Sequence, residues 1–523
     1  MAKLENIPGS LLHSPSGKQE DDDLKRVSST YKPLQTFRLA KEKSYQQQFA
    51  DMYFLRLTKI KPAVDDVALS AWDGTIVADE PVKRVERVLD IRQGELCWVT
   101  GTVYMEMPLK PNILEDVSKD RWISAPTTQE KYWSEEDAVT LEDESGRIRL
   151  VGDVLKSHIL VTGCIISVMG SENVNGELEV IDFKLPDLPP QPERWALSDP
   201  PSASDGKGKA KKPKDEDEEM TDATTRGSGG KIAIVSGLAF SGSDASHSLE
   251  LTLLLEYLLG EALDPSAQQE LSQISRLIIA GNSISLEERK VPLDEAQAKK
   301  PINKKYGYDA SSYNAVPSHL FDEFLASLLP TMPVTLLPGA QDPATASYPQ
   351  QPIHAAMFPN SRPFSAPPAT TDEGWLDTVT NPWEGEVEGW RVLGTGGQNI
   401  DDIFKYVDSE DRLGMMEATC RWRCMAPTAP DTLWSYPFQD DDPFVMKECP
   451  HLYFVGCQPE FGTKVIKGRE GQTVRLIAVP SFTATQEIVL VDSETLEVSK
   501  VELSVASGAS GQNVFTWESQ LRA

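Results

Sequence analysis

The sequence is poor in cysteine, has no long apolar run and is short of positive charge. Six cysteines among 523 residues are too few for a disulfide-stabilised extracellular protein, so we expect a reducing compartment. The first 18 residues lack the apolar core of a secretory signal. The most apolar helical stretch, residues 249–259, is interrupted by Glu256 and is too short to span a bilayer. We therefore expect the cytosol or the nucleus, and no membrane partner.

Lysines and arginines number 51 against 80 aspartates and glutamates, which gives a net charge of −29. A surface of this sign repels a phosphate backbone at long range, so we expect DNA to bind weakly at most and the main partners to be proteins. A lysine-rich segment, residues 207–214, directly precedes an acidic block. It is either a nuclear localisation signal or part of a solvated linker, and we expect the chain in the nucleus.

The length predicts more than one domain. Residues 1–30 are polar and predict a disordered tail. Residues 31–87 predict a helical region, in which an amphipathic helix over 45–60 docks on the chain itself or on a partner. The apolar side chains on one face of this helix are Tyr45, Phe49, Met52, Tyr53 and Ile60.

Residues 88–186 predict an all-β domain of the size of an OB-fold barrel, with residues 108–135 as an insertion between strands. Gly163 lies inside the fourth expected strand, which is typical of a bend at a barrel corner. The expected strands cover residues 96–104, 138–141, 147–151, 158–168 and 178–183.

OB barrels often bind single strands through aromatic side chains and a basic groove. Trp98 and Tyr104 are the candidates for stacking on bases. The neighbouring segments carry acidic residues such as Glu95, Glu106 and Glu142, which disfavour a nucleic acid. We therefore favour a packing role for both rings, with a single-strand-binding module as the alternative.

Residues 187–230 are rich in proline and serine and then in segregated charge, which predicts a disordered linker. From residue 231 to residue 523, buried strands alternate with helices, which predicts an α/β domain with a mixed sheet. Five of its strands end at a glycine-marked turn. They cover residues 232–235, 277–280, 334–337, 391–393 and 452–455.

Sites in α/β sheets form at the carboxyl ends of the strands. A two-metal phosphoesterase needs Asp, His and Asn side chains at those turns, because they hold two ions about 3.5–4 Å apart. Five glycine-marked turns therefore predict the architecture of such an enzyme.

Several longer motifs follow one another in a fixed order. They are Tyr31–Leu34 leading to Tyr53–Leu57, then Leu393–Asp402, Ala426–Leu433, Asp442–Phe444 and Cys449–Gly456. On these residues, the α/β half resembles the calcineurin-like phosphoesterase domain. The chain from residue 31 to residue 503 resembles the small (B) subunits of eukaryotic DNA polymerase delta. The resemblance implies an inactive, layered α/β/β/α domain, with an OB-fold barrel inserted or packed N-terminally to it.

The metal-ligand positions of active phosphoesterases are eroded in this chain, and only Asp342 keeps its carboxylate. Loss of outer-sphere partners alone lowers metal affinity about 10–100-fold, so loss of the ligands themselves should abolish the site. We expect no catalytic residue, no metal, no cofactor and no enzymatic activity. The eroded positions are Ser236, Leu238, Asn282, Ala340, Gln341, Cys457 and Pro459.

Two other interpretations of the polar residues are open. Cys420 and Cys424, with Cys449 and Cys457, have a spacing that zinc tolerates, although buried free cysteines are the commoner case. An active phosphoesterase or nuclease would need Asp342 or an unaligned ligand such as Asp244.

The resemblance implies a scaffold in DNA replication and repair. Its partners would be the C-terminal region of the polymerase delta catalytic subunit and a third, clamp-interacting subunit, with the sliding clamp reached indirectly. The candidate contact residues are Tyr45, Phe49, Tyr53 and Trp383, and packing within the chain is the alternative for each.

Overall fold

The computed structural model describes residues 25–42, 49–77, 79–111, 130–200, 230–260, 265–285, 314–366, 374–507 and 513–521. Tyr45, most of the expected tail, the centre of the expected insertion and the charged part of the expected linker lie outside these ranges. Within them, no helix combines the length and the apolar character that crossing a membrane requires.

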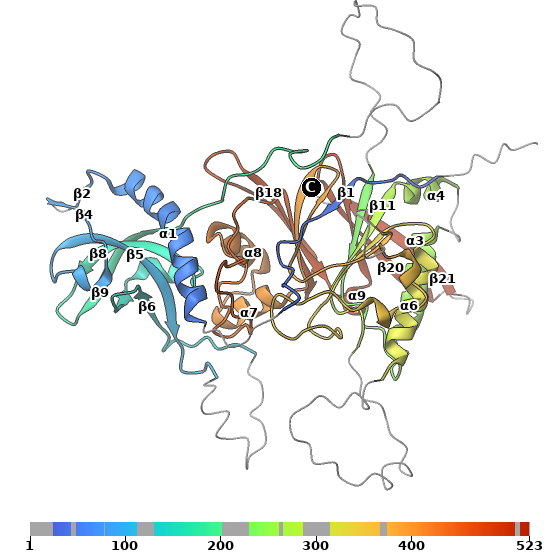
Figure 1. Ribbon diagram of the computed structural model, residues 1–523, viewed down its shortest axis with the longest axis horizontal. Helices are drawn as coiled ribbons and strands as arrows, with labels where there is room; N and C mark the ends of the chain where they lie inside the picture. The colour runs from blue at the N-terminus through green and yellow to red at the C-terminus, as the bar shows by residue number, and fades with distance from the viewer. Residues whose placement is uncertain are drawn as a thin grey trace, which may run out of the picture.

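The described chain forms a small barrel at one end and two larger sheets beside it, with helices on the outer faces of both sheets (Figure 1). We call the larger sheet nearer the barrel the proximal sheet and the other the distal sheet. The proximal sheet runs in the order β1 (Tyr31–Pro33), β14 (Trp383–Val387), β15 (Trp390–Thr395), β16 (Leu452–Gln458), β18 (Thr473–Pro480) and β17 (Gly462–Lys467). The distal sheet runs β13 (Leu376–Thr378), β12 (Val334–Leu337), β11 (Ile274–Ala280), β10 (Lys231–Val235), β19 (Glu487–Asp492), β20 (Val498–Ser507) and β21 (Asn513–Leu521).

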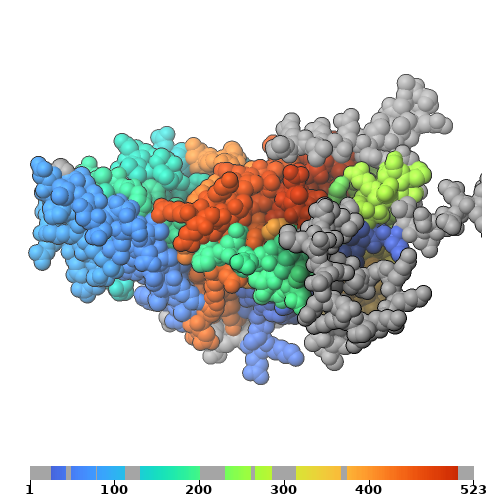
Figure 2. Space-filling model, turned by 90° about the horizontal axis from the view of Figure 1, so that it is seen from above, coloured from blue at the N-terminus to red at the C-terminus, as the bar shows by residue number. Residues whose placement is uncertain are grey.

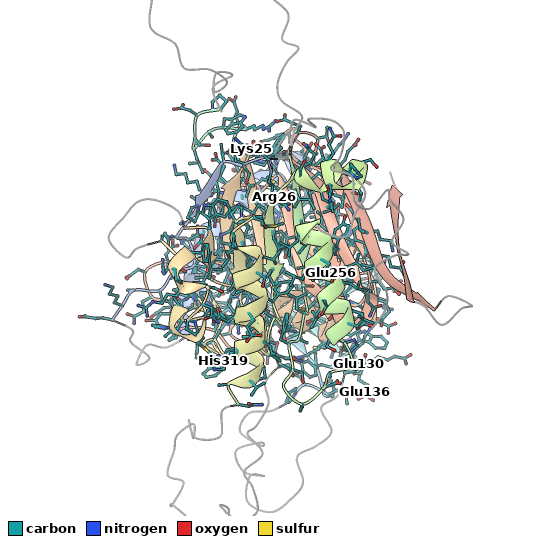
Figure 3. All side chains as sticks on the ribbon, turned by 90° about the vertical axis from the view of Figure 1, so that its right-hand side faces the viewer. Lys25, Arg26, Glu130, Glu136, Glu256 and His319 are labelled. Carbon is teal, nitrogen blue, oxygen red and sulfur yellow. The ribbon has the colours of Figure 1, made fainter. Side chains whose placement is uncertain are left out.

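Strands of the distal sheet are parallel from β10 to β13, because helices carry the chain back between them. Every residue of β11 is buried, as expected for a strand covered on both faces. The crossover helices are α3 (Ser248–Leu259), α4 (Pro265–Ser272) and α6 (Val316–Leu328). Figure 3 shows α3 and α6 side by side on the outer face of this sheet, with Glu256 on α3 and His319 on α6.

The two sheets pack face to face through side chains such as Ile234, Ile278, Trp383 and Phe454. On the other side of the proximal sheet lie α7 (Gln398–Tyr406) and α8 (Arg412–Arg421). Helices, two sheets and helices therefore form four layers, and the predicted mixed α/β architecture is confirmed. The short helix α9 (Phe482–Thr485) and the 3-10 turns η6 (Ala355–Met357) and η7 (Arg362–Phe364) complete this part.

The barrel closes because β5 pairs with both β6 and β8. Its strand order is β4-β5-β6-β7-β9-β8. The elements in and around it are β2 (Ile76–Val77), β3 (Glu80–Pro81), β4 (Lys83–Arg84), η3 (Val88–Asp90), β5 (Leu96–Glu106), β6 (Ala138–Glu142), β7 (Arg147–Val151), η4 (Asp153–Ser157), β8 (Ile165–Glu172) and β9 (Glu177–Lys184).

The expected strand over 158–168 is wrong in its first half. β8 begins only at Ile165, and Gly163 lies in the turn before it, with φ at +92°. A Cβ at Gly163 would overlap the carbonyl oxygen of Pro427 in the α/β part of the chain. The glycine is therefore needed where the barrel meets the α/β layers, and not at a corner of the barrel.

Helix α1 (Ala50–Trp72) joins the barrel to the α/β layers. It continues 12 residues beyond the predicted end at 60, since its last residue is Trp72. Met52 and Ile60 lie in one hydrophobic cluster with Ile165 of the barrel and Met416 of α8. The barrel, α1 and the proximal helices thus share a core.

The ends of the predicted tail and linker are wrong. Residues 187–200 cross the surface of the α/β part as the green band in Figure 2. The Cys449 amide donates to the carbonyl of Pro190 at 2.8 Å, and Gln191 accepts from the Thr473 amide at 3.0 Å. In the predicted N-terminal tail, Arg26 donates to the carbonyl of Leu258 at 2.7 Å. Proline and polar composition does not reveal such long-range hydrogen bonds.

Candidate functional site

The carboxyl ends of β10, β11, β12, β15 and β16 meet where the two sheets face each other, as the eroded motifs require. The approach is close enough that glycine is needed. A Cβ at Gly456 would overlap the carbonyl oxygen of Ala280, and one at Gly339 would overlap the backbone nitrogen of Asn282. Backbone atoms are therefore closely packed where these strand ends meet.

The residues at the eroded positions bind to one another. The Ser236 hydroxyl donates to the carbonyl of Pro480 at 2.9 Å and accepts from the Cys457 amide at 2.8 Å. The side-chain oxygen of Asn282 accepts from the backbone amide of Gln341 at 3.0 Å. Leu238 is fully buried in the cluster beneath α3 and α6. Polar side chains at these positions thus hold the turns together.

Asp342 keeps its carboxylate but uses both oxygens within the chain. It accepts from the amide of Ile284 at 2.8 Å and from that of Gly339 at 2.7 Å. Burial raises the pKa of Asp342 to about 6, and the backbone hydrogen bonds counteract part of that rise. Burial also raises the pKa of the Cys457 thiol, and the nearby carboxylates of Asp342 and Asp401 add to this effect. Asp342 therefore acts as a turn-holding group.

A network of amide side chains occupies the neighbouring space, and the sequence analysis did not identify it. Asn381 donates to Gln350 at 3.0 Å and to Gln398 at 2.8 Å, and it accepts from the Gly396 amide at 2.9 Å. Gln398 also donates to Gln350 at 2.8 Å. Amides both donate and accept, so this network satisfies its own members without charge. Gln398 lies inside the Leu393–Asp402 motif, and this motif is the one sequence feature that could have indicated the network.

No group of three or more His, Cys, Asp or Glu side chains that could hold a metal is found in the part of the chain that the structure describes. Ala340 and Pro459 are exposed and offer no ligand atom in their side chains. Cys424 and Cys449 are buried free thiols, and burial raises their pKa values to about 11 and about 12. High thiol pKa values oppose the thiolate that zinc binds.

The expected contact residues are scattered. Phe49 precedes α1 with 39% of its surface exposed. Tyr53 is half-buried, its ring 5.2 Å edge-on from Phe54, and burial raises its pKa to about 12. Trp383 is 1% exposed and packs between Tyr31 and Phe454, with ring centroids at 6.3 and 6.2 Å. Trp383 therefore belongs to the core between the sheets, and only a rearranged core could present it to a partner.

The aromatic residues of the barrel are covered by their own chain. Trp98 is 3% exposed, with Trp72 of α1 5.9 Å away and the Arg84 guanidinium 5.4 Å from its ring centroid. Tyr104 has Arg147 and Lys110 over its ring, at 4.4 and 4.9 Å. The packing prediction is confirmed for Trp98, while Tyr104 is half-buried and has two cationic groups of its own chain over its ring.

A buried ion pair fixes α1 to the α/β layers. The Arg56 guanidinium donates to Asp442 at 2.9 Å and to the carbonyl of Pro427 at 2.7 Å. Both charged side chains are almost completely buried, at 5% and 0% exposure. A buried pair of this kind requires its two elements to keep one geometry, because separating them would leave each charge unpaired.

Comparison with known families gives matches over both halves of the chain. The family model described as the OB-fold domain of the DNA polymerase delta subunit matches residues 48–183. The model described as the B subunit of DNA polymerase alpha/epsilon matches residues 232–463. Among solved structures, Vps29 of Chaetomium thermophilum overlaps 56% of the chain and 97% of its own length, at 10% identity and a TM-score of 0.24. That likeness is too low to bear on the fold.

Curated relatives match over nearly the whole length. The DNA polymerase delta small subunit of Saccharomyces cerevisiae is 33% identical over 495 residues, covering 89% of this chain and 91% of that protein. The small subunit of Arabidopsis thaliana is 34% identical, covering 92% and 96%. DNA polymerase delta subunit 2 of Drosophila melanogaster is 30% identical, covering 92% and 99%. The chain therefore belongs to the family of DNA polymerase delta small subunits.

Proposed function

We propose that this chain is a non-catalytic scaffold of nuclear DNA polymerase delta, acting in DNA replication and repair. It would hold the C-terminal region of the catalytic subunit and a third, clamp-interacting subunit, and would reach the sliding clamp only through them. Its α/β part would be an inactive relative of the calcineurin-like phosphoesterases. The membership of the family and the full-length matches support the role of an accessory subunit.

The observation that carries the proposal is the closure of the strand ends. Ser236, Asn282 and Asp342 hold the turns by hydrogen bonds within the chain, where an enzyme would hold ions. Oxygen atoms that already accept hydrogen bonds within the chain have fewer lone pairs to offer a metal. The same contacts stiffen the α/β layers. A rigid surface suits a scaffold whose function is to bind other subunits.

A second supporting feature is the junction through α1. The shared core and the Arg56–Asp442 pair make the barrel and the α/β layers one body. Partners bound to different parts of that body would keep a fixed spacing. We propose the barrel as residues 88–186 and the inactive phosphoesterase domain as residues 231–523, with residues 187–200 packed on the latter.

The test is co-expression of this chain with the C-terminal region of its own organism's polymerase delta catalytic subunit. Size-exclusion chromatography with metal analysis of each peak gives the result. We expect a stable 1:1 peak that contains metal only when the partner is present. Absence of a complex, together with two metal ions bound to this chain alone, would overturn the scaffold and favour a phosphoesterase.

A further inference from the structure

An open groove follows the outer face of α1. It encloses about 580 Å³. Its wall on the helix is a stripe spaced at three or four residues, and its opposite wall comes from the barrel. The lining residues are Phe54, Leu57, Thr58, Lys61, Pro62, Asp65, Asp66 and Leu69 of α1, with Arg84 and Glu144 across from them.

The groove is long enough for a helix. Its lining on α1 runs from residue 54 to residue 69, and fifteen steps at 1.5 Å per residue give about 22 Å. That length corresponds to about four helical turns. The same helix buries its opposite stripe, including Met52, Ile60 and Val64, in the shared core. One face of α1 is thus fixed in the shared core, and the opposite face is open to the groove.

Apolar groups mark one end of the groove. Phe54 is 48% exposed although it is followed by the buried Arg56 and Leu57. Leu89 is 69% exposed, and its backbone amide donates to Ser145 at 3.2 Å, which places it beside the turn that carries Glu144. Exposed large apolar groups around a concave surface are typical of protein interfaces, and aromatic anchors contribute most there.

The charges of the groove select the partner. On the floor, Arg84 pairs with Asp65 at 2.9 Å, and Asp65 also accepts from Thr100, so these charges are neutralised. Glu144 and Asp66, at opposite parts of the groove, are exposed and form no salt bridge with any residue that the structure describes. Lys61 also lines the groove and donates to the backbone carbonyl of Glu86 at 3.3 Å, so the two exposed carboxylates face one ammonium group. The remaining charge of the groove is therefore negative, as is that of the whole chain, at −29.

We infer that this groove binds an amphipathic helix carried by another subunit of the polymerase. The apolar face of that helix packs on Phe54 and Leu89, and its lysine or arginine residues pair with Glu144 and Asp66. This inference rests on the proposed function, since it names a surface for one of the partners. The chemistry that it assigns to the occupant is an apolar anchor at one end of the groove, with basic residues that reach Glu144 and Asp66.

The test uses the full chain co-expressed with the other polymerase delta subunits, and it compares variants at exposed positions. Phe54→Asp should weaken the affinity for one partner about tenfold or more, because it removes the largest exposed apolar anchor of the groove. The double variant Asp66→Lys, Glu144→Lys should weaken binding of the same partner and flatten the dependence of its affinity on salt. Matched controls are Val465→Asp, which is 40% exposed on β17, and Glu136→Lys; both should bind within about twofold of the unchanged chain.

The outcomes separate the groove from the scaffold. If both groove variants bind every partner as the unchanged chain does, the groove inference is wrong while the scaffold stands. If the unchanged chain binds none of the other subunits, the scaffold itself fails, and the groove inference with it. If Phe54→Asp disrupts only a dimer of this chain, the occupant is a second copy and the inference is overturned. Equal melting temperatures of variants and parent exclude misfolding as the cause.

Discussion

The strand ends of the α/β layers and the outer face of α1 treat their polar groups in opposite ways. At the strand ends, Ser236, Asn282 and Asp342 all find partners inside the chain, and backbone closes the remaining space. Along the groove on α1, Phe54 is half-exposed, and the carboxylates of Asp66 and Glu144 are exposed. In the first region the polar groups have partners within the chain, and in the second the exposed groups are available to a partner. Satisfaction of polar groups, more than their number, distinguishes a structural region from a binding region.

The largest expected effect comes from the buried side of α1. Arg56→Met should destabilise the chain by about 3–5 kcal/mol, because it leaves Asp442 charged and buried without a partner. Denaturant unfolding would measure this. Lys83→Met, which breaks the exposed pair with Glu95, is the matched control and should cost under about 1 kcal/mol. Similar losses in the two variants would show that the buried pair is not needed at the junction.

The closure of the strand ends can be broken at one glycine. Gly456→Ala should cost about 3 kcal/mol, since its Cβ would overlap the carbonyl oxygen of Ala280 and force two strand ends apart. Gly471→Ala is the comparison, because that site has open space and only a positive φ of +87°. It should cost about 1 kcal/mol. Equal unfolding free energies for the two variants would contradict the tight closure.

The carboxylate of Asp342 should make stability depend on pH. Its pKa is raised to about 6 in the folded chain from an ordinary 3.8, so the folded state binds a proton before the unfolded state does. Its contribution to stability therefore grows as the pH falls through about 6 and is lost as the pH rises through the same range. Relative to Asp342→Asn, the chain should gain about 1 kcal/mol between about pH 7.5 and about pH 5.5.

Thermal melts of the two chains at both pH values would measure this gain. A difference in melting temperature that does not change with pH would mean that Asp342 titrates at its ordinary pKa. It would then be less buried than its hydrogen bonds to Ile284 and Gly339 indicate.

The smallest expected effect is that of added metal. Manganese or zinc should leave the melting temperature of the isolated chain within about 1 °C, because a ligand stabilises a protein only when it binds the folded state. The same addition to the Cys457→His, Ala340→His double variant serves as a comparison, since it supplies imidazoles at two eroded positions. A clear rise for the unchanged chain would contradict the absence of a metal site.

Much of the α/β part could be predicted from the sequence, for a definite physical reason. Strands such as β11 are buried on both faces, so they appear as unbroken apolar runs that end in a glycine turn. By contrast, the burial of Trp383 could not be predicted, because a tryptophan packs equally well in a core or an interface.

Other features depend on contacts between distant residues. Gly163 looked like part of a strand, but its conformation is set by Pro427, which lies far along the chain. Residues 187–200 looked like a linker, but Gln191 and Arg194 bind to Thr473 and Glu494. The groove could not be predicted from the sequence of α1 alone, because Arg84 and Glu144 of the barrel form its other wall. No local pattern contains that information.

The packed segment at residues 25–39 has a consequence for biosynthesis. Arg26 binds the carbonyls of Leu258, Leu271 and Ile274, and the Tyr31 hydroxyl donates to Asp377 at 2.5 Å across 346 residues of chain. A ribosome makes this segment early, yet the last of its partners emerges only after more than two thirds of the protein has been translated. Contacts so distant along the chain form slowly, because the intervening loop must first close. Among the residues that the structure describes, this early-made segment is therefore one of the last to reach its final position.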